Sequence, residues 1–226
     1  MYHIELVVFD MAGTTVNEDN VVYKTLQKAI NTAGRQLPLD FVLAHGAGKE
    51  KHQAIKDILK EEDGKYHEEE ALVLFESFKS LLEKAYENLA VTTYAGVEDL
   101  IDFLRKNHIK IALNTGYDTK TAQFLIDKMK WKLGVQFDAL VTADDVQKGR
   151  PNPDMIFKAM HILQIDSPEK VLKAGDSIID IEEGKNAQCG MTIGVTTGAH
   201  TRAQLASAHP TYVLDSLLEL KGLLSK

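Results

Sequence analysis

Four short segments of this sequence carry side chains whose types and positions could perform chemistry. Carboxylates at Asp10 and Asp176 can act as nucleophiles or bind a hard cation, and Arg150 can bind an anionic group. In chain order the segments read Asp10-Met-Ala-Gly-Thr-Thr15, Asn114-Thr-Gly-Tyr117, Gly149-Arg-Pro-Asn-Pro153 and Gly175-Asp-Ser-Ile-Ile-Asp180. One such segment alone is weak support, but four in a fixed order indicate a built site.

Each segment ends or follows a short apolar run that is typical of a strand buried on both faces. Helical patterns separate these runs. The strands are expected at residues 6–9, 109–113, 139–141, 171–172, 191–195 and 212–214, and the helices at about 97–107, 119–129, 153–163 and 180–188. Alternating strands and helices predict βαβ units. We therefore expect an α/β fold with a Rossmann-like parallel sheet.

The stretch between residues 18 and 90 interrupts this alternation. It is polar and helical, with helices expected at 22–33, 50–60 and 67–88. The acidic run at 61–70 is expected to be a solvated connection between the last two helices. Because ligands of open α/β sheets bind beyond the carboxyl ends of the strands, an insertion there would cover the site. We expect a helical cap domain at 18–90 and a catalytic core at 1–17 and 91–226.

Composition excludes several functional classes. The 226 residues carry a formal net charge of −7, which argues against a nucleic-acid or anionic-membrane partner. The single cysteine, Cys189, rules out an intramolecular disulfide framework and suits a reducing compartment. Neither a bilayer-spanning apolar run nor a signal peptide is evident. We expect a soluble cytoplasmic protein that acts on a small molecule.

The four segments together resemble the haloacid dehalogenase superfamily of phosphotransferases and phosphohydrolases. The resemblance implies that Asp10 is the nucleophile and forms an aspartyl-phosphate. It also implies a Mg²⁺ ion bound by Asp10, Asp176 and the backbone carbonyl of Ala12, with Asp180 supporting the metal site. Without that resemblance, Asp10 and Asp176 could equally be structural helix caps.

The resemblance also assigns the residues that bind the phosphoryl group. Thr115 and the backbone at Gly116 would bind its oxygens, and Arg150 would supply a fixed positive charge. Tyr117 would position the cap or the substrate.

Two departures from the superfamily pattern narrow the resemblance. Most members carry a second aspartate two residues after the nucleophile, as general acid and base, but this chain has Ala12. The usual lysine of the third segment is replaced by Arg150. Both departures, together with Thr115-Gly-Tyr117, are similar to the phosphonoacetaldehyde hydrolase (phosphonatase) branch. That branch implies cleavage of a carbon–phosphorus bond and a dimer formed through the cap.

The phosphonatase resemblance also implies a cap lysine that forms a Schiff base, in a Gly-x-x-Lys-x-x-His setting. The stretch His45-Gly-Ala-Gly-Lys-Glu-Lys-His52 places Lys49 and His52 at those positions. Three residues apart on a helix, they would share a face, and the helix N-terminus and Lys51 would lower the pKa of Lys49. His52 would then shuttle protons. The alternative is an exposed lysine in a lysine-rich helix and an ordinary half-buried histidine.

The expected function is hydrolysis of phosphonoacetaldehyde or a close 2-oxo-ethylphosphonate. Two alternatives stay open at this point. One is a phosphomonoesterase of the same fold, for instance acting on phosphoglycolate, in which Lys49 only attracts the substrate. The other is a catalytically silent binding protein, against which the intact carboxylates Asp10 and Asp176 argue.

Overall fold

The computed structural model describes residues 3–87 and 89–225. At its centre lies a parallel six-stranded sheet in the order β5-β4-β1-β6-β7-β8. The strands are β1 (Leu6–Asp10), β4 (Lys110–Asn114), β5 (Ala139–Val141), β6 (Val171–Gly175), β7 (Met191–Val195) and β8 (Tyr212–Leu214). The α/β fold with a Rossmann-like parallel sheet that the sequence predicts is confirmed.

The inner strand β1 is buried along its whole length. Its side chains alternate between two apolar clusters, with Val7 and Phe9 in one and Leu6 and Val8 in the other. This alternation follows from the two-residue period of a strand. Because both faces are covered, the strand reads as a continuous apolar run rather than an alternating one.

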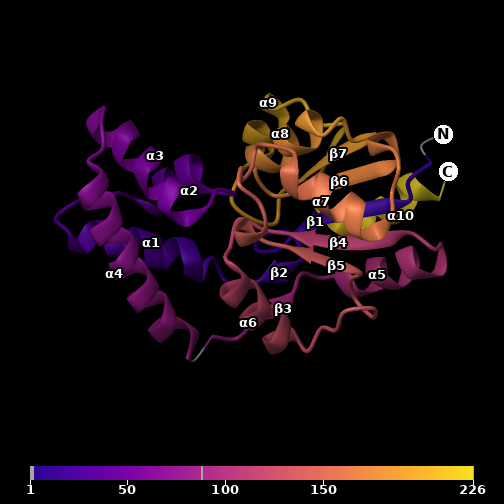
Figure 1. Ribbon diagram of the computed structural model, residues 1–226, viewed down its shortest axis with the longest axis horizontal. Coiled ribbons are helices and arrows are strands. Elements are labelled where there is room, and N and C mark those ends of the chain that lie inside the picture. The colour runs from indigo at the N-terminus through magenta and orange to yellow at the C-terminus, as the bar shows by residue number, and fades with distance from the viewer. Residues whose placement is uncertain (1–2, 88, 226) are drawn as a thin grey trace.

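Helices cover both faces of the sheet (Figure 1). They are α5 (Val97–Lys106), α6 (Thr119–Met129), α7 (Asp154–Leu163), α8 (Ile178–Asn186), α9 (Arg202–Ser207) and α10 (Leu220–Leu224), with the 3-10 helices η1 (Ala143–Asp145), η2 (Pro168–Lys170) and η3 (Leu217–Glu219). The helices α5 to α8 lie where the sequence predicts helices. The helices α9 and α10 were not predicted. With 6 and 5 residues, they are too short to show the hydrophobic periodicity of a helix in the sequence.

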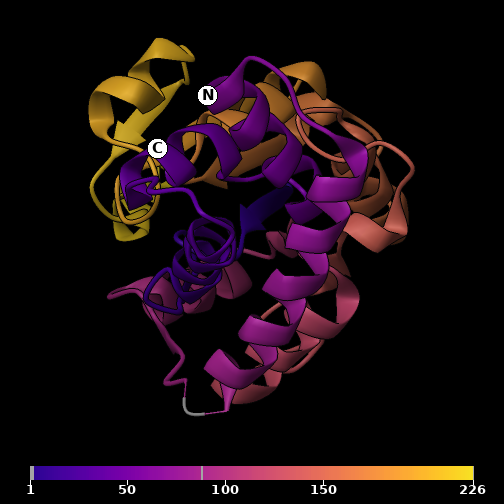
Figure 2. The same ribbon diagram turned by 90° about the vertical axis from the view of Figure 1, so that its left-hand side faces the viewer.

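A layer of four helices, which we call the cap, lies beside the sheet in Figure 1 and in front of it in Figure 2. The cap consists of α1 (Val21–Thr32), α2 (Leu39–Gly46), α3 (Lys51–Asp63) and α4 (Glu68–Tyr86). The chain enters and leaves it through an antiparallel pair, β2 (Val16–Asn17) and β3 (Thr92–Thr93). The expected boundaries at 18 and 90 stay a prediction.

The cap differs in detail from the three predicted helices. The short helix α2 was not predicted, because its sequence is mostly apolar and shows no clear polar face. The helix predicted at 50–60 continues to Asp63, where Gly64 takes a φ of 73° and ends it. The helix predicted at 67–88 is α4, and residue 88 lies outside the described residues. Among the helices described, none is long and apolar enough to span a bilayer.

The acidic run at 61–70 is more than a solvated connection. Arg35, from the segment after α1, forms ion pairs with Glu62, Asp63 and Glu70, at N–O distances of 2.9, 2.9 and 2.6 Å. Six of the ten residues of the run belong to helices α3 and α4, and this arginine joins the two helix ends.

Candidate active site

Three of the four segments meet at one edge of the sheet. The central strand β1 pairs with β4 on one side and with β6 on the other, and Asp10 stands opposite Asn114 in the register. Asp10, Thr115 and Asp176 therefore follow the carboxyl ends of three neighbouring strands. All three side chains are buried.

The turn after Asp10 is shaped to fit around Asp176. Gly13 has a φ of +86°, and a Cβ atom there would lie 2.2 Å from Oδ2 of Asp176, so the position requires glycine. The hydroxyl of Thr14 donates to Oδ1 of Asp176 at 3.2 Å. Ala12 lies in the same turn, half-buried, and its methyl group can neither donate nor accept a proton.

Asp10, Asp176 and Asp180 form a buried cluster of carboxylates whose nearest oxygens lie within 4.8 Å of one another. Burial raises the pKa of Asp10, and burial together with the charges of Asp10 and Asp180 holds the pKa of Asp176 well above its usual range. A divalent cation would offset this repulsion, and carboxylate oxygens are the ligands that Mg²⁺ prefers. The residues present therefore fit a magnesium ion.

Arg150 connects the nucleophile candidate to Asp180. Its Nη1 lies 2.9 Å from Oδ1 of Asp10 and also donates to Oδ1 of Asp180. The same Asp180 oxygen accepts from Lys173 at 2.9 Å, and Oδ2 accepts from Ser177 at 2.6 Å. Burial alone would raise the pKa of Asp180, but the charges of Lys173 and Arg150 lower this pKa to about 2. This arrangement favours a role for Asp180 in fixing Arg150 over direct binding of a metal.

A buried charge network under this site was missed by sequence analysis. Lys173 of β6 has no exposed surface, and its Nζ lies 2.6 Å from Oδ1 of Asn114 and 3.4 Å from a carboxylate oxygen of Glu183. Asn114 in turn donates to both Glu183 oxygens, at 2.8 and 2.9 Å. The sequence signal for this network is a lysine that continues a buried apolar run. It was missed because we expected that strand to end at residue 172. Glu183 and the three aspartates together make four buried carboxylates, whereas the network contains two buried cations, Arg150 and Lys173. One divalent cation would balance the difference in charge.

Lys49, to which the phosphonatase resemblance assigns the Schiff base, does not pair with this cluster. Its Nζ pairs with Oδ2 of Asp57, 2.6 Å away within the cap. The physical reason is the helix boundary. The carboxylate of Glu50 accepts hydrogen bonds from the backbone amides of His52 and Gln53 and thereby caps α3. The helix therefore begins at Lys51, and Lys49 precedes it.

His52 consequently does not share a helical face with Lys49. Its ring stacks on Phe75 at a centroid distance of 5.3 Å, and its Nε2 lies 3.5 Å from a carboxylate oxygen of Glu68. Both contacts are with the cap helix α4. These neighbours favour packing over the predicted proton shuttle.

The side chain of Lys51, rather than that of Lys49, contacts an aromatic ring of the core. Lys51 is only 6% exposed, and its Nζ lies 4.9 Å from the ring centre of Tyr23 and 5.0 Å from that of Tyr117. Burial, reinforced by the charge of Arg150, lowers the pKa of Lys51 to about 8. The cap thus presents a buried amine of low basicity to the core.

The second segment forms the core side of this contact. Thr115 accepts a hydrogen bond from the Tyr117 amide at 3.2 Å. A Cβ atom on Gly116 would lie 2.9 Å from the Gly48 carbonyl oxygen, so Gly116 lets the core loop pack directly on the cap backbone. The Tyr117 hydroxyl is buried without a hydrogen-bond partner among the described residues. Of the predicted substrate-binding residues, Tyr117 faces Lys51 and Gly116 supports the contact.

Comparison with known proteins identifies the family. The model of the haloacid dehalogenase-like hydrolases matches residues 4–188. This chain is a haloacid dehalogenase-like hydrolase. It is 31% identical over 260 aligned positions to the phosphonoacetaldehyde hydrolase of Latilactobacillus sakei, covering 100% of this chain and 97% of the relative. It is also 30% identical over 225 positions to the pyrophosphatase PpaX of Bacillus mycoides, covering 99% and 98%.

The fold of this haloacid dehalogenase-like hydrolase matches solved structures as well. A phosphonoacetaldehyde hydrolase like protein from Oleispira antarctica superposes with a TM-score of 0.83 at 23% identity, covering 99% of this chain and 92% of that one. The expected relationship to the superfamily and its phosphonatase-like branch is confirmed by these matches.

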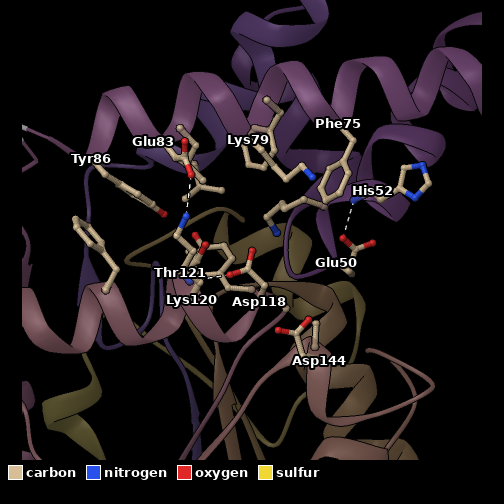
Figure 3. Close-up of a pocket in the computed structure, with 18 residues that line it drawn as sticks. Glu50, His52, Phe75, Lys79, Glu83, Tyr86, Asp118, Lys120, Thr121 and Asp144 are labelled. Carbon is tan, nitrogen blue, oxygen red and sulfur yellow. Dashed lines mark hydrogen bonds and ion pairs between the residues drawn. The ribbon is translucent and has the colours of Figure 1, made fainter.

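A cavity of about 680 Å³ lies between cap and core of this haloacid dehalogenase-like hydrolase, with α4 on one side and α6 on the other (Figure 3). Lys51, Gly116 and Tyr117 belong to its wall. The wall of the cavity therefore includes the lysine whose amine contacts Tyr117.

Proposed function

We propose that the enzyme hydrolyses the carbon–phosphorus bond of phosphonoacetaldehyde or of a close 2-oxo-ethylphosphonate. The observation that carries the proposal is the buried amine of Lys51, which lies against Tyr117 and whose pKa is lowered by burial and by the charge of Arg150 in the core. In this proposal Lys51, rather than Lys49, forms the Schiff base. The phosphonoacetaldehyde hydrolase relatives support the same chemistry.

The depressed pKa suits Lys51 to attack a carbonyl group. With a pKa of about 8, roughly a tenth of the amine is neutral at pH 7, about 300 times more than for an ordinary lysine. The neutral amine adds to the carbonyl carbon, and loss of water with uptake of one proton leaves an iminium ion. The iminium withdraws electrons from the carbon that carries phosphorus.

Asp10 then attacks phosphorus while the carbon–phosphorus bond breaks. The bonding pair moves to carbon and neutralises the iminium, so the leaving group is an enamine and the phosphoryl group is bound to Asp10. Arg150, 2.9 Å from Asp10, would stabilise the phosphoryl charge. No oxygen needs protonation in this step, which explains how Ala12 can occupy the position of a general acid.

Two waters complete the cycle. The enamine takes a proton on carbon, and one water hydrolyses the resulting iminium to the aldehyde and free Lys51. A second water hydrolyses the aspartyl-phosphate to phosphate and Asp10. A Mg²⁺ ion held by Asp10, Asp176 and the Ala12 carbonyl would stabilise the charged phosphoryl oxygens when bound.

A phosphomonoesterase or pyrophosphatase activity is the second candidate, because PpaX is similar over nearly the whole chain. It would use the same Asp10, Arg150 and metal cluster. It needs an acid for an oxygen leaving group, however, and Ala12 cannot supply one.

The deciding experiment is covalent trapping. Incubation with phosphonoacetaldehyde and sodium borohydride should inactivate the enzyme and add mass to the peptide that contains Lys51, whereas neither reagent alone should do so. Lys51→Arg keeps the charge, cannot form the imine, and should lose nearly all C–P cleavage.

Lys49→Arg is the matched control and should keep most of the activity, because Lys49 pairs with Asp57. An adduct that maps to Lys49, or efficient cleavage by Lys51→Arg, would contradict the assignment of Lys51. Rapid hydrolysis of phosphate esters or pyrophosphate with no phosphonate cleavage would favour the second candidate.

A further inference from the structure

The cavity between α4 and α6 is larger than a two-carbon substrate needs. Its volume is about 680 Å³, within the range of about 300–1,000 Å³ that holds drug-sized ligands. Lys51 lies in its wall, and α4 lines it from Phe75 to Tyr86. If the proposed function holds, the substrate's carbonyl carbon is attached to Lys51, and a group on that carbon would extend into this cavity.

The walls of the cavity suit an apolar or aromatic group. The cap helix α4 contributes Phe75, Phe78 and Leu82, and Phe124 of α6 lies opposite. Phe124 stacks on Tyr86 with ring centres 4.5 Å apart and an interplanar angle of 23°. Aromatic side chains of this kind favour flat or apolar ligand groups.

The charged groups at the rim are already engaged. Asp118 and Asp144 accept hydrogen bonds from backbone amides at the start of α6, at 2.7 and 2.8 Å. Glu83 of the cap pairs with Lys120 of the core at 2.8 Å. These groups stabilise helix ends and the cap–core contact, so they do not require a charged ligand.

Three polar atoms in the wall have no hydrogen-bond partner among the described residues: Nε2 of His52 and the hydroxyls of Tyr117 and Tyr86. The hydroxyl of Tyr86 is buried, with the residue 8% exposed, and makes no hydrogen bond to any described residue. Figure 3 shows it directed into the cavity. A buried hydroxyl without a partner is unfavourable, and an oxygen atom of a ligand would satisfy it.

We propose that the preferred substrate is a 2-oxoalkylphosphonate whose carbonyl carbon bears an apolar or aromatic substituent of several carbons, ending in an oxygen that accepts a hydrogen bond from Tyr86. The carbonyl reacts at Lys51 and the substituent lies between α4 and α6. The cavity thereby selects the substrate by the substituent on its carbonyl carbon, which takes no part in the reaction.

The test compares four phosphonates by phosphate release. They are phosphonoacetaldehyde, 2-oxopropylphosphonate, 2-oxo-4-phenylbutylphosphonate and the 4-methoxyphenyl form of the last. The phenyl ketone should exceed the methyl ketone in kcat/KM by roughly 10–200-fold, and the methoxy group should add roughly three- to tenfold.

Two variants locate the effect. Tyr86→Phe should remove only the gain from the methoxy group, and Phe124→Ala should reduce the gain from the phenyl group. The exposed residues Tyr212 and Phe157 provide matched controls, so Tyr212→Phe and Phe157→Ala should leave all four substrates unchanged.

The outcomes separate this inference from the proposed function. If the two small phosphonates are cleaved at least as efficiently as the phenyl ketones, the inference is overturned and C–P cleavage stands. If Tyr86→Phe leaves the methoxy gain intact, the role of Tyr86 is overturned. If no phosphonate is cleaved while phosphate esters are, both the proposed function and this inference fail.

Discussion

The Nζ of Lys51, on a cap helix, lies 5.0 Å from the ring centre of Tyr117, which follows a core strand. This contact brings the buried amine of one layer against a residue that follows a strand end of the other. The position of the amine relative to Asp10 therefore depends on how the cap is seated on the core. The same contact explains why burial and the charge of Arg150 lower the pKa of a lysine that lies outside the sheet.

The first prediction concerns the nucleophile. Asp10→Asn should lower kcat by at least about 10³-fold, because the amide has nearly the same shape but cannot attack phosphorus. Phosphate release measures the effect, and a thermal melt checks the fold. Asp102→Asn, at an exposed position of α5, is the control and should be fully active. Substantial turnover by a well-folded Asp10→Asn sample would exclude Asp10 as nucleophile.

The second prediction concerns the metal. Chelation should abolish activity, and added Mg²⁺ should restore it. Asp176→Ala should weaken Mg²⁺ binding at least about tenfold, measured by titration calorimetry, because it removes one carboxylate of the buried cluster. Full activity after exhaustive chelation would show that the cluster does not need a cation.

The third prediction concerns Ala12. The wild-type enzyme should hydrolyse alkyl phosphates roughly 10²–10⁴-fold less efficiently than a homologue with a general acid at this position. Ala12→Asp should raise hydrolysis of the alkyl phosphate phosphoglycolate without improving phosphonate cleavage. Efficient phosphoglycolate hydrolysis by the wild type would instead support the phosphomonoesterase alternative.

The fourth prediction concerns pH. Lys51 must be neutral to attack, and its pKa is about 8. Below pH 8 the protonated form dominates, so kcat/KM for the phosphonate should fall about tenfold for each unit of decreasing pH and level off above pH 8. A rate profile from pH 6 to 9.5 tests this. A rate that still rises about tenfold per unit between pH 8 and 9.5 would mean that the reacting amine is an ordinary exposed lysine.

The fifth prediction concerns stability. Lys173→Met should lower the free energy of unfolding by about 3–5 kcal/mol, because it leaves Glu183 as a buried carboxylate without its cation and removes one of the two cations that contact Asp180. Adding Glu183→Gln should recover more than half of that loss, since the neutral amide can still contact Asn114. Urea denaturation at pH 7 measures both variants. Equal stability of Lys173→Met and wild type would contradict the proposed charge network.

Sequence patterns predicted the sheet and most core helices well, because buried parallel strands and amphipathic helices produce distinct periods. The strand-end positions of Asp10, Thr115 and Asp176 followed directly from that prediction. Family resemblance supplied their roles.

The cap amine could not be predicted in the same way. Lys49 and Lys51 are separated by one residue, and the choice between them depends on where α3 begins. That boundary is fixed by the capping carboxylate of Glu50. Sequence spacing leaves helix ends uncertain by at least this difference. Lys173 was missed for another reason: its partners Asn114 and Glu183 lie far from it in sequence and meet it only in the folded sheet.

The division of reactive groups between two layers has a consequence for product release. In the proposed cycle, cleavage leaves the phosphoryl group bound to Asp10 of the core and the carbon fragment bound to Lys51 of the cap. The chain crosses between these layers only at the paired strands β2 and β3. Movement of the cap about this crossing would pull the two fragments apart while each is still covalently held. The reverse reaction, which needs both fragments side by side, would then be prevented by distance before either product reaches solvent.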